Sequence, residues 1–280
     1  MFKILKKEEL SPNVFSMDIA APRVARKAQA GQFIVLRVDE KGERIPLTIA
    51  NFNRETGVVT IVFQVIGAST MELAAVEAGG SILDFAGPLG QPSAIRKFDG
   101  TVVVVGGGIG VAPTFPIARA MKEAGNKVIA VMGAKTKDIL IMEDEMKEVT
   151  DEILITTDDG SRGIKGFVTY AVQELANRGE NIAQVTAIGP VIMMKSVADC
   201  TRRLGIPTVV SLNPIMVDGT GMCGGCRVLI GGETKFACVD GPEFDGHLVD
   251  FPALMNRQRM YRDFEAEEKE HICNIGLGRN

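Results

Sequence analysis

Apolar residues in the first hundred positions occur in short runs that turn residues separate. Two of these runs, Gln32–Val38 and Val58–Ile66, have the length and β-branched composition of strands. Only Ser69–Ala78 has the composition of a helix in this part, and that helix is short. Short strands bounded by turns are typical of antiparallel barrels, so we expect residues 1–98 to form one.

From Thr101 onward the pattern changes to apolar strands that alternate with helices. The expected strands are Val102–Val105, Lys127–Met132, Ile153–Ile155 and Val185–Ile188. The expected helices are Pro113–Ala124, Glu143–Val149, Phe167–Arg178 and Lys195–Leu204. Because this alternation indicates a parallel, doubly wound α/β sheet, we expect such a domain over residues 99–212.

The remaining chain follows neither pattern. Residues 213–250 contain a glycine-rich cysteine loop, which we expect to form a small domain of its own. Residues 251–280 form a tail that is rich in charge and in helix formers between Pro252 and His271. The tail is predicted to be either a solvated helix or an arm that docks on a partner subunit.

Charge and cysteine content narrow the class of protein. The chain has 280 residues, a formal net charge of −4 and five cysteines. Nothing in this charge favours nucleic acid or an anionic membrane. Unpaired cysteines fit a reducing cytosol, and the charged residues directly after Met1 argue against a signal peptide. The uncharged stretch Thr101–Ala118 is interrupted by glycines and prolines, so we expect a cytoplasmic protein without a membrane span.

The cysteine loop carries the most specific motif of the chain. Its residues Asp218, Cys223, Cys226 and Cys238 have the spacing D-x4-C-x2-C-x11-C. A plant-type [2Fe–2S] loop has the spacing C-x4-C-x2-C followed by a distant fourth cysteine, so an aspartate stands here at the first ligand position. The glycines of the loop let the backbone wrap around a cluster. The spacing predicts a [2Fe–2S] cluster with these four residues as its ligands.

Two other interpretations of the loop remain open. Three cysteines and an aspartate also make a tetrahedral zinc site, although zinc ribbons usually pair two C-x2-C knuckles and this chain has one. Alternatively, Cys226 and Cys238 are ordinary buried thiols in a glycine-rich turn.

Three loops are expected at one edge of the parallel sheet. The run Gly106–Pro113 joins the first strand of this domain to its helix, and such glycines let a backbone approach a pyrophosphate. Further candidates follow two later strands, where ligands collect in parallel sheets. The candidate dinucleotide residues are Gly107, Gly108, Ile109, Gly110, Ala112, Pro113, Asp158, Asp159, Gly160, Gly189 and Pro190.

The barrel segment contains a second, weaker candidate. Gly67, Ser69 and Thr70 place small hydroxyl residues beside a glycine at a helix start, where a pyrophosphate could bind. The same pattern also occurs in helix capping, so the residues alone leave both roles open.

Together these segments resemble the ferredoxin-NADP reductase superfamily with a C-terminal [2Fe–2S] loop, over roughly residues 1–250. The resemblance rests on Pro46–Thr48, Gly87–Gly90, Gly106–Pro113, Asp159–Ser161 and Gly189-Pro190. Within it the chain is similar to dihydroorotate dehydrogenase electron-transfer subunits. The aspartate at the first ligand position and the segment Cys238–Asp245 resemble more closely the small subunits of NADH-dependent reduced ferredoxin:NADP oxidoreductases, which are electron-bifurcating transhydrogenases.

The resemblance implies FAD in the barrel and NAD(H) at the glycine loops. It implies no catalytic acid or base, a larger flavin and iron–sulfur partner subunit, and ferredoxin as an indirect partner. The implied flavin contacts are Pro46, Leu47, Thr48, Phe63, Gln64, Val65, Gly67, Ser69 and Thr70.

The chain departs from the family pattern at two places. Ile45 separates Arg44 from Pro46, where relatives have arginine directly before the proline, and Ile188 stands where relatives often have cysteine. Three other functions remain open at this point. They are a dihydroorotate dehydrogenase electron-transfer subunit, a stand-alone reductase, and a zinc-stabilised assembly subunit without catalysis.

Overall fold

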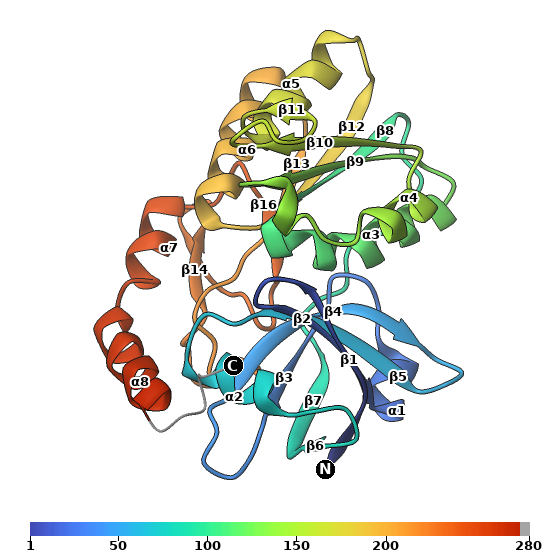
Figure 1. Cartoon of the computed structure of the whole chain (residues 1–280). Coiled ribbons are helices and arrows are strands. Elements are labelled where there is room, and N and C mark those ends of the chain that lie inside the picture. Colours follow the sequence, from blue (N-terminus) through green and yellow to red (C-terminus); the bar gives the residue numbers. More distant parts are fainter. Residues whose placement is uncertain (275–280) are drawn as a thin grey trace.

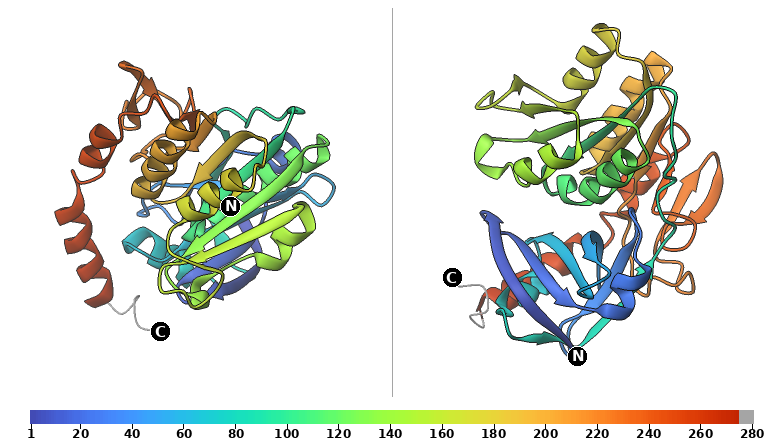
Figure 2. Two further views of the ribbon diagram at one scale, coloured as in Figure 1. Left: turned by 90° about the horizontal axis from the view of Figure 1, so that it is seen from above. Right: turned by 90° about the vertical axis from the view of Figure 1, so that its right-hand side faces the viewer.

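The computed structural model of the protein describes residues 1–274, with side chains through His271. Figure 1 shows a barrel that contains the N-terminus, and beyond it a second sheet that is covered by helices. The segment that follows the second sheet returns along one side of both, as the turned views in Figure 2 show. This arrangement confirms the predicted fold class of a β-barrel, an α/β nucleotide-type domain and a small C-terminal unit.

The barrel is one antiparallel sheet with the strand order β6-β1-β2-β5-β4-β3-β7. Its strands are β1 (Phe2–Ser11), β2 (Val14–Ala20), β3 (Phe33–Arg37), β4 (Ile45–Asn53), β5 (Val58–Gln64), β6 (Ser81–Ile82) and β7 (Asp84–Leu89). Along β3, Ile34 and Leu36 lie in the barrel core, whereas Phe33 and Val35 lie in a separate apolar cluster. Both faces of β3 are therefore buried, which explains its continuous apolar run.

Two short helices belong to the barrel, α1 (Pro22–Lys27) and α2 (Ala68–Ala75). The second is the helix predicted near Ser69–Ala78. The first was not predicted, because six residues are too few to show a helical period. Its first residue is a proline, which suits the first turn of a helix.

The second sheet has the order β11-β10-β9-β8-β12-β13-β16. Its strands are β8 (Thr101–Gly107), β9 (Lys127–Ala134), β10 (Glu152–Thr157), β11 (Ile164–Lys165), β12 (Ile182–Ile188), β13 (Thr208–Ser211) and β16 (Glu243–Asp245). All neighbours pair in parallel except β16, which comes from the C-terminal unit and pairs antiparallel with β13. The small unit is thus joined to the sheet by main-chain hydrogen bonds.

Helices cover both faces of this sheet. They are α3 (Val111–Glu123), α4 (Glu143–Val149), α5 (Val168–Asn177) and α6 (Val191–Leu204), with the short 3-10 turns η1 (Gly108–Gly110) and η2 (Lys137–Ile139). Val103 and Val105 face α5 and α6, whereas Val102 and Val104 face α3 and α4. Helix α6 begins at Val191 instead of Lys195, because its first turn is an apolar run that resembles a strand.

The C-terminal unit contains a hairpin and two helices. The hairpin is formed by β14 (Arg227–Ile230) and β15 (Glu233–Phe236), and the helices are α7 (Phe251–Arg257) and α8 (Arg262–Asn274). The tail predicted as one helix is therefore two, and α8 lies against α2 of the barrel (Figure 1). Residues 275–280 and the Cys273 side chain lie outside the described residues. Within residues 1–274, no helix has the length and apolar character that crossing a membrane requires.

Candidate functional site

The four predicted cluster ligands lie in two pairs. Cys226 and Cys238 are buried, and their Sγ atoms are 3.2 Å apart. Asp218 and Cys223 form the other pair, in which the backbone N–H of Cys223 donates to Asp218 Oδ2 at 2.8 Å. Each of the two irons of a [2Fe–2S] cluster takes two protein ligands. The donor set and its division into pairs therefore fit such a cluster.

A mononuclear metal site fits less well. In the described part of the chain, no three His, Cys, Asp or Glu side chains are arranged to hold one metal ion. A structural zinc ion needs four ligands around a single point. The buried-thiol interpretation accounts for Cys226 and Cys238, but not for the exposed Cys223 in the same loop.

Asp218 shapes the loop through both of its carboxylate oxygens. Oδ1 accepts hydrogen bonds from the backbone N–H of Thr220 and from Thr220 Oγ1, the latter at 2.9 Å. These bonds, the one from the Thr220 N–H first, hold the pKa of Asp218 at about 2. The group is therefore an anion at neutral pH, as an iron ligand must be.

The pKa of the Cys238 thiol is shifted in the opposite direction. Burial first, and then the hydrogen bond with Cys226, raise the pKa of the Cys238 thiol to about 12. Because thiolate is the form that binds iron, Cys238 would have to release a proton to act as the predicted cluster ligand.

The cysteine loop rests on the outside of the barrel. Phe33 and Val35 of β3 form one apolar cluster with Cys226 and Cys238. At Gly219 φ is +77°, and a Cβ would lie 2.9 Å from a Leu89 methyl and 3.0 Å from a Val35 methyl, so only glycine fits this contact.

The predicted flavin strand lies beside this contact. In the register of β3 and β4, Thr48 is opposite Phe33, and Pro46 is opposite Val35. Residues directly opposite in an antiparallel pair point to the same side of the sheet. Pro46 and Thr48 are therefore on the same face of the barrel as the residues that contact the buried cysteine pair.

The second flavin segment is adjacent to β4. Ser69 Oγ donates to Glu43 Oε2 at 2.8 Å, which brings the first turn of α2 beside the β3–β4 loop. A Cβ at Gly67 would meet nothing within 4 Å, so the backbone is open to a ligand there. The Thr70 hydroxyl accepts from the Gly67 N–H at 3.1 Å and thus acts as a helix cap.

The other predicted flavin residues differ in what they can contact. The Phe63 side chain is 1% exposed in the barrel core, so only its backbone is left for a flavin. The strand ends at Gln64, whose side chain is exposed, and the Val65 N–H donates to Asn13 O at 2.8 Å. Leu47 is half-buried and packs against the barrel core.

The glycine loops meet at one edge of the parallel sheet, as predicted. Gly106 pairs with Ile188, Gly107 pairs with Gly133, and Thr157 pairs with Ala134. The carboxyl ends of β8, β9, β10 and β12 are therefore aligned. Turn η1 lies against β5, so this edge faces the barrel.

The structure separates two roles among the loop glycines. A Cβ at Gly107 would lie 2.2 Å from Met193 Sδ, and one at Gly110 would lie 2.1 Å from Ile188 O. The main chain thus requires glycine at position 110, whereas a Cβ at position 107 would displace the Met193 side chain. Gly108 has φ +56° and nothing within 4 Å of a Cβ, so it is the loop position open to a ligand. Gly189 also packs on Met193, with a Cβ at 2.9 Å from its methyl.

The remaining dinucleotide candidates differ in exposure. Ala112 is fully buried in the apolar core between the two sheets, Ile109 packs against that core, and Pro113 is half-buried. Asp159 accepts from the Ser161 N–H at 3.0 Å and the Ser161 hydroxyl at 2.7 Å, and these bonds lower the pKa of Asp159. Asp158 is exposed.

Sequence reasoning missed Met193, Phe33 and Val35 as site residues. Each is an apolar residue within an apolar run, so no residue type distinguishes it. Only the pairing of β3 with β4 and the packing of α6 on the glycine loops bring these residues to the sites.

Comparisons with known proteins agree with this geometry. Residues 213–250 match the iron-sulfur cluster binding domain of dihydroorotate dehydrogenase B, and residues 104–199 match the oxidoreductase NAD-binding domain. A Thermotoga maritima homolog of the electron transfer subunit of dihydroorotate dehydrogenase B (NAD(+)) is 51% identical over 94% of this chain and 92% of that protein. The corresponding subunit of Desulforamulus reducens is 32% identical over 86% of this chain and 94% of that protein.

A solved structure extends the likeness to the whole chain. It is the structure of an NADH-dependent reduced ferredoxin-NADP oxidoreductase, which was studied for flavin-based electron bifurcation. The two chains superpose with a TM-score of 0.92 and 49% identity, over 98% of each.

Fold and site together define a flavin- and NAD-dependent iron–sulfur oxidoreductase subunit that transfers electrons. Its cofactors are FAD, a [2Fe–2S] cluster and NAD(H), as the sequence predicted. The chain belongs to the family of dihydroorotate dehydrogenase B electron-transfer subunits and their homologues.

Proposed function

We propose that the chain exchanges a hydride with NAD(H) at FAD in the barrel, and relays single electrons through Asp218, Cys223, Cys226 and Cys238 to a partner subunit. The register of β3 and β4 carries this proposal. It puts Pro46 and Thr48 on the face that contacts the buried cysteine pair. A flavin on that face would lie beside the cluster loop.

FAD, when bound, supplies the conversion between a two-electron hydride and single electrons. The chain's own residues bind and orient the two nucleotide cofactors. The backbone at Gly108 and the first turn of α3 are suited to a pyrophosphate, since a helix N-terminus offers unpaired N–H groups. Phe33 and Val35 exclude water between the β4 face and the cysteines.

The partner we propose is a larger flavin and iron–sulfur subunit of an NADH-dependent reduced ferredoxin:NADP oxidoreductase, with ferredoxin as an indirect partner. The likeness over 98% of both chains supports it. The dihydroorotate dehydrogenase alternative is less favoured, because Asp218 replaces the first cysteine of the loop. The tail supports docking, since Met260, Tyr261 and Phe264 are 58%, 48% and 69% exposed.

The test is an anaerobic NADH titration of the complex of both subunits, followed by visible and EPR spectra. Cys226→Ala should leave flavin reduction by NADH in place and abolish electron transfer to the partner. Cys200→Ala is the matched control, because Cys200 is buried in α6 away from the loop. Full transfer in Cys226→Ala would overturn the relay.

Removing residues 259–280 tests the docking arm separately. The truncated subunit should keep its flavin and iron content but lose affinity for the partner by at least about tenfold. Unchanged affinity would assign docking to another surface.

A further inference from the structure

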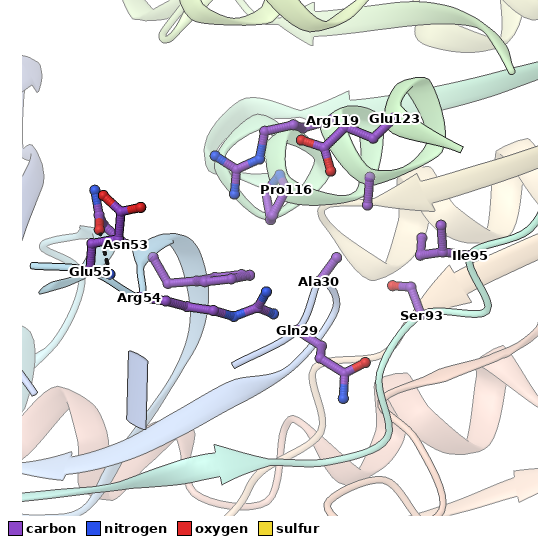
Figure 3. A pocket seen from close by; sticks show the side chains of 12 residues that line it. Gln29, Ala30, Asn53, Arg54, Glu55, Ser93, Ile95, Pro116, Arg119 and Glu123 are labelled. Atoms are coloured by element: carbon purple, nitrogen blue, oxygen red, sulfur yellow. Dashed lines mark hydrogen bonds between the residues drawn. The ribbon is translucent and has the colours of Figure 1, made fainter. Parts of the chain in front are cut away.

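A cleft of about 570 Å³ lies between the barrel and the nucleotide domain (Figure 3), and no residue of the glycine loops lines it. The end of β4, the hairpin after it and the residues before β3 form one wall. The linker near Ser93 and Ile95 and the second half of α3 form the other. The volume is that of a small-molecule site.

Two arginines from the two domains meet at one phenyl ring in this cleft. The guanidinium carbon of Arg54 lies 5.2 Å from the centre of the Phe52 ring, and that of Arg119 lies 5.6 Å from it. One hydrogen bond also positions each guanidinium. Arg54 donates to Ala28 O at 3.0 Å, and Arg119 donates to Asn51 Oδ1 at 2.8 Å. Stacking and these single bonds fix both groups, and the described residues accept from no other N–H donor of either guanidinium.

Neither arginine has a carboxylate partner within 4.0 Å among the described residues. Two glutamates line the cleft. Figure 3 shows Glu55 beside Asn53 at the hairpin, while the Arg54 side chain points the other way into the cleft. Glu123 follows Arg119 by one helical turn on α3 and forms no ion pair with it.

The rest of the wall combines apolar side chains with the polar groups of Asn53 and Ser93. Ala30, Ile95, Pro116 and Ala120 line it, and the Gln29 side chain adds one amide. We infer that this cleft binds a small organic anion, with a phosphate or carboxylate head held by Arg54 and Arg119 and an apolar body against Ile95, Pro116 and Ala120. Planar guanidinium groups recognise such oxyanions with paired hydrogen bonds.

The cleft lies between domains, so a ligand bound in it would also affect how the domains are held together. Arg54 belongs to the barrel and Arg119 to the nucleotide domain, so one anion between them would tie the two domains together. The linker that crosses the cleft also carries Ser93, whose hydroxyl donates to Glu243 Oε1 at 2.5 Å in the C-terminal unit. An anion here would therefore stabilise the arrangement of all three parts.

The test uses FAD- and cluster-loaded protein saturated with NAD⁺, so that the dinucleotide site is already filled. Calorimetry with phenyl phosphate should give one saturable event, with a dissociation constant of about 1 mM or lower. Arg54→Gln and Arg119→Gln should each weaken it by at least about tenfold. Arg96→Gln is the matched control, because Arg96 stacks on Phe98 at 4.7 Å outside the cleft, and it should change binding less than about twofold.

Two results would overturn the inference. One is the absence of saturable binding to the wild-type protein, and the other is an equal loss in Arg96→Gln, which would mean general charge attraction. Titration with inorganic phosphate shows whether the apolar wall contributes, since phenyl phosphate should then bind at least about threefold more tightly. Should Arg119→Gln fail to fold, Arg54→Gln decides alone, because its side chain is exposed.

Discussion

The Asp218 carboxylate accepts a hydrogen bond from the backbone N–H of Cys223 at 2.8 Å. The residue at the predicted first ligand position therefore also closes the loop that presents Cys223, the predicted second ligand. Ligation and loop closure can be partly separated, because the single amide oxygen of asparagine can still accept from the Cys223 N–H. Its uncharged NH2 group then cannot accept from the Thr220 N–H, as Oδ1 of Asp218 does.

We expect Asp218→Asn to keep the loop and the fold, with a melting temperature within a few degrees of wild type, and to alter the EPR spectrum and potential of the cluster. Asp218→Ala should lose loop closure as well, at about 1 kcal/mol. Thermal unfolding of the apoprotein and EPR of the loaded protein measure the two effects. An unchanged spectrum and potential in both variants would show that Asp218 is not a ligand.

Gly108 and Gly205 provide a matched pair for the dinucleotide site. Both have positive φ, +56° and +68°, and an added Cβ meets nothing within 4 Å at either. Asparagine tolerates this conformation, so both Asn variants should fold. Gly108→Asn should weaken NADH binding at least about tenfold, because its side chain enters the space open to a pyrophosphate. Equal NADH affinity in Gly108→Asn and Gly205→Asn would place the dinucleotide elsewhere.

Gly107 is required by Met193 and not by backbone conformation. Its φ of −109° and ψ of 120° suit any residue, but an added Cβ would lie 2.2 Å from Met193 Sδ. Gly107→Ala should therefore destabilise the fold by about 1–3 kcal/mol. Met193→Ala in the same chain should recover at least about 1 kcal/mol of that loss in denaturant unfolding. Additive effects of the two substitutions would contradict this contact.

The order of strands and helices could be predicted well from the sequence, because the longer elements show a clear periodic pattern of apolar residues. Helix α4 has the predicted bounds, and the glycine loops meet at the predicted edge. Residue spacing also predicted a cluster-binding unit, and residues 213–250 match an iron-sulfur cluster binding domain. Short elements such as α1 and β16 were not predicted, because elements of three to six residues are too short to show a periodic pattern. The roles of Gly107 and Gly108 could not be separated either, because the difference depends on the distant Met193.

The Glu243 carboxyl joins the C-terminal unit to Ser93 of the linker, and its burial makes the stability of this contact depend on pH. Burial raises the pKa of this carboxyl, and the Ser93 hydroxyl only partly offsets the effect. A raised pKa means that the folded state binds the proton more tightly than the unfolded state. The stability contribution is therefore complete below the unfolded pKa of about 4.3 and is lost as pH rises through the folded pKa.

Glu243→Gln keeps an oxygen for Ser93 and removes the charge. It should raise the melting temperature by a few degrees at pH 8, and the gain should disappear near pH 4. Thermal unfolding at both pH values measures this difference. A loss of stability at pH 8 would mean that the charge itself supports the junction.

We propose above that this chain holds a flavin and a [2Fe–2S] cluster side by side. The most direct measurement is the visible and low-temperature EPR spectrum of protein purified without oxygen, with flavin, iron and zinc counted on the same sample. We expect one flavin, two irons and no zinc per chain, and a [2Fe–2S] signal that appears on reduction. Zinc in place of iron, without flavin, would contradict it.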